Sequence, residues 1–152
     1  VAENTVIKVF DKEPFSRKNM LNLKYIHEFA SDLVKKYNVV APGIKVPVMF
    51  LSGGNIQRLI LARELSLNPK FIIAEHPTAG LDVAATNFIH NTLIKLRNRG
   101  CGILLISADL DEILKLSDRV AVMYNGEILK IYKSVTEINL TELSKLMLGI
   151  RE

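Results

Sequence analysis

The chain has 152 residues, of which 49% are hydrophobic and 24% are charged, values typical of one globular domain. Disorder and collagen-like repetition are excluded, and no apolar run reaches the roughly 20 residues that a membrane helix needs. The one cysteine forms no internal disulfide, and three scattered histidines make no metal-ligand cluster, so we expect a reducing, cytosolic setting.

The formal net charge of +4 raises the question of nucleic-acid binding. Residues 1–50 carry eight Lys and Arg against five acids, residues 51–100 six against three, and residues 101–152 six against eight. The excess is thin and spread out, without the basic stripe and interleaved aromatic residues of a phosphate-binding surface. We therefore predict no nucleic-acid partner.

The first half of the chain predicts two helices. The first runs from Leu23 to Tyr37, because apolar residues recur there at spacings of three and four and Asn22 is a candidate N-cap. Two prolines and a glycine at positions 42–47 indicate a connector. The second helix, Ile56–Leu67, follows the segment Leu51–Asn55, in which Ser52 is the candidate N-cap, and it ends before Asn68–Pro69.

From residue 71 the pattern changes period. Three short apolar runs are typical of strands buried on both faces, namely Phe71–Ala74, Ile103–Ile106 and Val120–Tyr124. Helical patterns lie between them, Val83–Leu96 with Asp82 as N-cap and Leu110–Leu116. Strands that alternate with helices predict an α/β fold, with a parallel sheet covered by helices.

The last part of the chain predicts a hairpin and a helix. Asn125–Gly126 is a hairpin turn signal, so Glu127–Tyr132 is expected to run antiparallel to the strand before it. The final helix, about Thr141–Leu148, is expected to turn three apolar side chains inward: Leu143, Leu146 and Met147.

A serine and two glycines before the second helix form a candidate anion site. Gly53 and Gly54 let the backbone approach a ligand closely, and free N–H groups with the helix dipole favour an anion such as a phosphate. Ser52 adds a hydroxyl donor. The alternative is an ordinary loop with an N-cap, because so short a motif has weak specificity.

Two carboxylates are candidates for binding as well. Glu75 ends the apolar run at 71–74, where a parallel sheet presents its ligand-binding edge, and it could hold Mg²⁺ directly or through water. Asp82 closes the turn Ala79–Asp82. For each residue a structural role is the alternative, a polar strand end for Glu75 and a helix cap for Asp82.

In their order and spacing these segments resemble the ATP-binding domain of ABC transporters, over nearly the whole chain. The matching segments are the signature loop Leu51–Gly54, the Walker B strand Phe71–Glu75, the D-loop Ala79–Asp82 and the switch loop Ser107–Asp109. Residues 51–57, 74–82 and 106–113 are similar to the second ATP-binding half of simple-sugar and nucleoside importer ATPases.

The resemblance implies a partial P-loop NTPase (RecA-like) sheet with helices, preceded by the ABC helical subdomain. We expect that subdomain, with the signature loop, at residues 1–67 and the C-terminal portion of the RecA-like core at residues 68–152. The Walker A motif G-x-x-x-x-G-K-[ST] is absent from the sequence and by resemblance lies upstream. The chain is therefore expected to be part of a domain, inactive alone and with apolar surface exposed.

The resemblance also implies ATP and Mg²⁺ as cofactors. Its implied partners are a second ABC ATP-binding domain, in a head-to-tail dimer, and membrane permease subunits, with the chain peripheral at the cytoplasmic face of the cell membrane. The implied nucleotide-binding residues are Leu51, Ser52, Gly53, Gly54, Asn55 and Asp82, and Glu75 is the implied metal ligand.

Three positions depart from the family pattern at the catalytic site. Walker B normally ends in Asp then Glu, but here the pair is Glu75 then His76, and Ala108 stands at the switch-histidine position. An imidazole can accept a proton near neutral pH but does not supply a carboxylate's charge, and the methyl group of Ala108 offers no hydrogen bond. Each such loss typically costs ~10²–10⁴ in rate, so we expect this site to be weak or inactive.

The signature loop, in contrast, matches the family pattern at every position. We therefore expect the chain to supply its loop to the partner's site, as the ATP-binding component of a sugar or nucleoside importer. Two alternatives stay open, a soluble ABC ATPase without a permease and a regulatory or scaffolding module that contributes nothing to catalysis. The residues at 75, 76 and 108 favour the module, whereas Ser52 to Gly54 speak against it.

Overall fold

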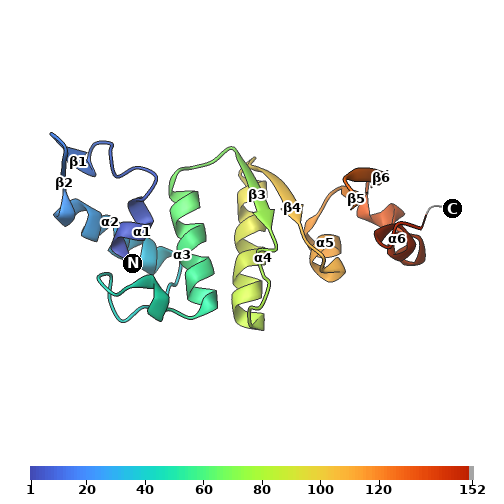
Figure 1. Ribbon diagram of the computed structural model, residues 1–152, viewed down its shortest axis with the longest axis horizontal. Coiled ribbons are helices and arrows are strands. Elements are labelled where there is room, and N and C mark those ends of the chain that lie inside the picture. The colour runs from blue at the N-terminus through green and yellow to red at the C-terminus, as the bar shows by residue number, and fades with distance from the viewer. Residues whose placement is uncertain (151–152) are drawn as a thin grey trace. The chain divides into compact units, whose positions relative to one another are not determined.

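A computed structural model describes residues 1–150 (Figure 1). Its helices are α1 (Ala2–Val6), α2 (Leu23–Lys36), α3 (Gly53–Ser66), α4 (Val83–Asn98), α5 (Leu110–Leu116) and α6 (Leu140–Met147), with short 3-10 helices η1 (Val48–Phe50) and η2 (Val135–Glu137). Its strands are β1 (Ser16–Arg17), β2 (Met20–Leu21), β3 (Phe71–Glu75), β4 (Gly102–Ile106), β5 (Val120–Tyr124) and β6 (Glu127–Tyr132). Among these residues no helix has the length and hydropathy that a membrane crossing requires.

The chain forms two compact units. The first comprises residues 1–72 and 77–103, and the second comprises residues 73–76 and the chain from Leu104 onward. The predicted boundary between residues 67 and 68 stays a prediction, and the last two residues of the expected segment 68–152 lie outside the described residues.

Local sequence signals explain the helices of the first unit. Asn22 Oδ1 accepts the Tyr25 N–H at 3.2 Å and caps α2, as predicted. The helix α3 begins at Gly53, earlier than the predicted Ile56, because the Ser52 carbonyl already accepts the Ile56 N–H at 2.9 Å. Asn68, in the left-handed region with a φ of 48°, ends that helix as predicted.

Two clusters of buried side chains hold the helices of the first unit together. One joins α1 to α2 through Ala2, Val6, Ile26 and Ala30. The other joins the chain around α3 to its N-terminus through Val1, Val39, Leu51 and Leu59. The short hairpin β1–β2 shows no alternating apolar pattern, since each strand has only two residues.

The strands β3 and β4 pair with each other, as the α/β pattern predicts. The Gly102 N–H donates to the Lys70 carbonyl at 2.9 Å and the His76 N–H donates to the Ile106 carbonyl at 2.8 Å, so the two strands run parallel. The predicted burial of both faces is wrong, because no described residue covers one face. The exposed side chains are Phe71, Ile73, Leu104 and Ile106.

The second unit contains the predicted hairpin of β5 and β6. Val120 is opposite Tyr132 and Tyr124 is opposite Glu127, in antiparallel register. Asn125 and Gly126 have φ values of 48° and 81°, which confirms the turn prediction. Within residues 1–150 the strand β5 pairs with β6 alone, so β3 and β4 are the parallel part of the fold.

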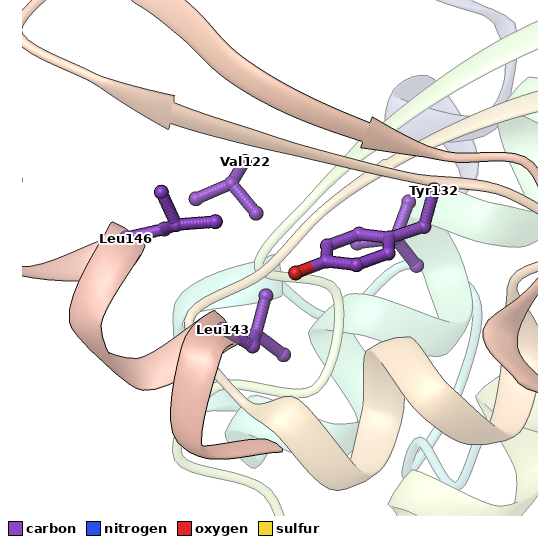
Figure 2. Packing of buried hydrophobic residues seen from close by; sticks show 5 residues of the cluster. Val122, Tyr132, Leu143 and Leu146 are labelled. Atoms are coloured by element: carbon purple, nitrogen blue, oxygen red, sulfur yellow. The ribbon is translucent and has the colours of Figure 1, made fainter. Parts of the chain in front are cut away.

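The helix α6 packs on this hairpin. Figure 2 shows Leu143 and Leu146 of α6 pointing toward Val122 and Tyr132, and all four side chains are buried. Met147 is 38% exposed, so its predicted burial is wrong; it is the last residue of α6 and lies beyond the stripe of Leu143 and Leu146.

Candidate functional site

The signature loop places an exposed serine directly before α3. Ser52 is the N-cap by position, as predicted, but its side chain makes no capping hydrogen bond. Its Oγ instead accepts a hydrogen bond from Asn55 Nδ2 at 2.8 Å. The first backbone N–H groups of α3 are therefore left uncapped by this side chain, as an anion-binding helix start requires.

The two glycines of the loop differ in their surroundings. A β-carbon at Gly53 would meet no atom within 4 Å, whereas one at Gly54 would lie 3.2 Å from Ala85 Cβ. The tight contact with α4 explains the glycine at position 54. Nothing in the described residues requires a glycine at position 53, the first residue of α3. An open Gly53 backbone fits the close approach of a ligand.

Two residues expected to bind nucleotide have partners inside the chain. Leu51 is 8% exposed and belongs to the buried cluster with Val39 and Leu59, so it anchors the loop. Asn55 Oδ1 accepts the Val40 N–H at 2.7 Å, so its amide links the loop to the segment that follows α2.

The D-loop lies beside the signature loop within the first unit. Asp82 Oδ1 accepts the Ala85 N–H at 2.7 Å and caps α4, as predicted. Ala85 is also the residue that Gly54 approaches, and α3 and α4 run side by side (Figure 1). The Arg58 guanidinium carbon lies 4.5 Å from the centre of the Phe88 ring and joins the same helices.

Charged side chains tie the end of α3 to the N-terminal segment. Lys8 Nζ lies 2.5 Å from Glu64 Oε2, and Arg63 Nε lies 2.9 Å from Glu64 Oε1. Burial alone would raise the pKa of the Glu64 carboxyl, but the hydrogen bonds and charges of Lys8 and Arg63 outweigh it and hold the pKa below its ordinary value. The helix that begins at the signature loop is thus fixed at both ends.

The three positions that are expected to form a degenerate catalytic site lie in the second unit. Glu75, His76 and Ala108 are all exposed, at the carboxyl ends of β3 and β4. The backbone of His76 has a φ of 42°, in the left-handed region that few residues other than glycine and asparagine adopt. Its N–H bonds to Ile106 at the end of β4, so the pairing of β3 with β4 holds this conformation.

The side chains at positions 75, 76 and 108 have few hydrogen-bond partners. Among residues 1–150 we find no hydrogen bond to the His76 imidazole, and no group of three or more His, Cys, Asp or Glu that could hold a metal. A single carboxylate, Glu75, is available at the strand end. Mg²⁺ is commonly bound by one or two carboxylates together with substrate phosphates, so Glu75 fits as one ligand of an ion that a nucleotide also holds.

Sequence reasoning missed two contacts that position the loop. One is the bond from Val40 to Asn55, and the other is the stacking of Arg58 on Phe88. Both contacts join residues that are 15 or more positions apart. Arg58 also donates from Nη1 to the Asn38 carbonyl at 2.9 Å. No periodicity or turn signal reports such pairs.

Curated relatives match nearly the whole chain, although no family model matches it. A nucleoside import ATP-binding protein, NupA of Lactococcus lactis, is 42% identical over 149 residues, which is 98% of this chain and 29% of the relative. A ribose import ATP-binding protein, RbsA 2 of Rhizobium meliloti, is 38% identical over 128 residues, 84% of this chain and 25% of the relative. The chain thus spans less than a third of the length of these relatives.

A solved structure supports the same assignment. An ATP-binding cassette of an ABC transporter superposes with a TM-score of 0.72 and 26% identity, over 98% of this chain and 61% of that one. The chain therefore belongs to the ABC transporter ATP-binding proteins, as the resemblance implied, and it corresponds to a C-terminal part of an ATP-binding domain.

Proposed function

We propose that the chain is part of the ATP-binding component of an ABC importer for nucleosides or sugars. The observation that carries this proposal is the 42% identity with a nucleoside import ATP-binding protein over 98% of the chain. The uncapped start of α3 and the open backbone of Gly53 support it, because both suit a phosphate ligand.

In this proposal the signature loop of the chain completes the nucleotide site of a second ABC ATP-binding domain, in a head-to-tail dimer. Ser52 donates its hydroxyl to a phosphate, and the Gly53 backbone approaches it. Leu51 and Gly54 hold the loop against the core and α4, and Asp82 fixes the neighbouring D-loop through its cap of α4.

The chain's own catalytic positions form a site that turns nucleotide over slowly. Glu75 would hold Mg²⁺, which neutralises phosphate charge when it is bound with ATP. His76 lacks a carboxylate's charge, and no described residue orients its imidazole. The methyl side chain of Ala108 offers no group for a hydrogen bond, so two catalytic contributions are lost from one site.

The proposed setting is the cytoplasmic face of the cell membrane, where permease subunits bind the dimer.

Reconstitution of the complete protein with its permease in liposomes tests the proposed import function. We expect ATP-dependent uptake of labelled nucleoside or ribose, lost with Ser52→Arg. Hydrolysis without any effect of the permease would favour a soluble ATPase. Uptake unchanged by Ser52→Arg would favour a regulatory or scaffolding module.

A further inference from the structure

The side-chain amide of Asn55 has one possible orientation. Its two hydrogen-bond partners are the Val40 N–H at 2.7 Å and Ser52 Oγ at 2.8 Å. A backbone N–H can only donate, so the amide oxygen of Asn55 must face Val40. The NH₂ group must then face Ser52, and the serine oxygen must accept.

This orientation determines what the serine hydroxyl can do. A hydroxyl has one proton to donate, and Asn55 presents a donor rather than an acceptor to it. Within residues 1–150 we find no acceptor for the Ser52 proton, and the side chain is exposed. The Ser52 proton is thus directed away from Asn55 and into solvent, beside the open backbone of Gly53.

We propose that Asn55 is a positioning residue, which acts on nucleotide through Ser52 and not by direct contact. The Asn55 amide donates to the Ser52 oxygen, so that this oxygen is an acceptor within the chain. The hydroxyl proton of Ser52 then stays available for a phosphate oxygen on the facing domain. Val40 follows the buried Val39, so the segment directly after α2 sets this orientation. The inference rests on the proposed function of the signature loop.

The substitution Asn55→Asp separates this role from a merely structural one. A carboxylate keeps an acceptor for the Val40 N–H and nearly the same shape, but it replaces the donor to Ser52 with a second acceptor. The serine proton then turns toward the carboxylate. Asn55→Ala removes both bonds. Asn139→Asp is the matched control, because Asn139 caps α6 through its Oδ1 and receives the same change of charge.

The test measures the ATPase rate of the complete protein with its partner domain, and hydrogen exchange of the Val40 amide. We expect Asn55→Asp to lower kcat about a hundredfold, as the loss of one preorganised donor does, while the Val40 amide stays protected and Asn139→Asp keeps the wild-type rate. If Asn55 only tethers Val40, Asn55→Asp keeps the wild-type rate and Asn55→Ala alone is impaired, which overturns the proposal.

The same substitution in a Ser52→Ala background distinguishes positioning from direct contact. If Asn55 acts through the serine hydroxyl, the ATPase rate of the double variant stays within about threefold of the rate of Ser52→Ala. A further loss of tenfold or more would show that Asn55 or its charge acts on the nucleotide itself and would overturn the proposal. A wild-type rate for Ser52→Ala alone would instead contradict the proposed function of the loop.

Discussion

Gly54 lies against Ala85 so closely that a β-carbon at position 54 would be 3.2 Å from Ala85 Cβ. The contact joins the start of α3 to the start of α4, and so joins the signature loop to the D-loop. The neighbouring Gly53 has open space around it. The two adjacent glycines therefore have different roles. Gly54 allows the close contact with α4, and Gly53 leaves the backbone at the surface open.

We expect Gly53→Ala to stabilise the chain by less than the roughly 0.5–1 kcal/mol typical of a helix interior, because position 53 is the first residue of α3 and an added β-carbon meets no atom there. Gly54→Ala should stabilise the chain less, or destabilise it, because Ala85 would have to move to make room for the added β-carbon. Urea unfolding followed by circular dichroism measures both. In the complete protein, Gly53→Ala lowers ATPase activity despite its stability, and a Gly53→Ala variant that is both more stable and fully active would contradict the ligand-facing role of this glycine.

The order of elements and their caps could be predicted from the sequence, because they depend on short-range signals. Asn22, Asp82 and the Asn125–Gly126 turn act over two to four residues, and each behaves as predicted. The burial of β3 and β4 could not be predicted, because it depends on what covers the sheet. Periodicity reports only that a face is apolar.

The candidate site was predictable in part for the same reason. Fixed spacings identified the loop at 51–54, but they did not show that Leu51 is buried or that the amide of Asn55 bonds to Val40. Those facts depend on contacts between segments distant in sequence. The departure of Glu75–His76 from the family pattern was visible in the sequence, whereas the left-handed backbone at His76 was not.

A second prediction concerns the stacking of Arg58 on Phe88 across α3 and α4. We expect Arg58→Lys to destabilise the chain, because lysine keeps the charge but loses the guanidinium contact with the Phe88 ring and the geometry of the bond to the Asn38 carbonyl. A double-mutant cycle with Phe88→Leu should give a coupling free energy of about 0.5–1 kcal/mol. Additive effects of the two substitutions would show that the Phe88 ring and the guanidinium do not interact.

A third prediction concerns acid stability of the second unit. Hydrogen bonds from Lys130 and Tyr132, the latter at 2.9 Å from Tyr132 Oη to Glu142 Oε2, hold the pKa of the Glu142 carboxyl below its ordinary value. Because the folded pKa is lowered, this stabilisation is complete above the ordinary Glu pKa of about 4.3 and is lost as the pH falls through the folded value.

We therefore expect the difference in unfolding free energy between the wild type and Glu142→Gln to shrink as the pH falls below about 4. Tyr132→Phe, which keeps the ring in the core but removes the hydroxyl, should move the acid-sensitive range upward. Denaturant titrations across this pH range measure both effects. A difference that does not change with pH would show that Glu142 is not stabilised in its charged form.

In the proposed dimer this chain supplies a competent signature loop and carries a degenerate catalytic site. The most direct test is the steady-state ATPase rate of the complete protein assembled with its partner domain, for Ser52→Arg and His76→Ala. We predict that Ser52→Arg abolishes hydrolysis, because a long cationic side chain blocks the loop, and that His76→Ala barely changes the rate. A large loss of rate with His76→Ala, or an unchanged rate with Ser52→Arg, would show that the two sites do not have these roles.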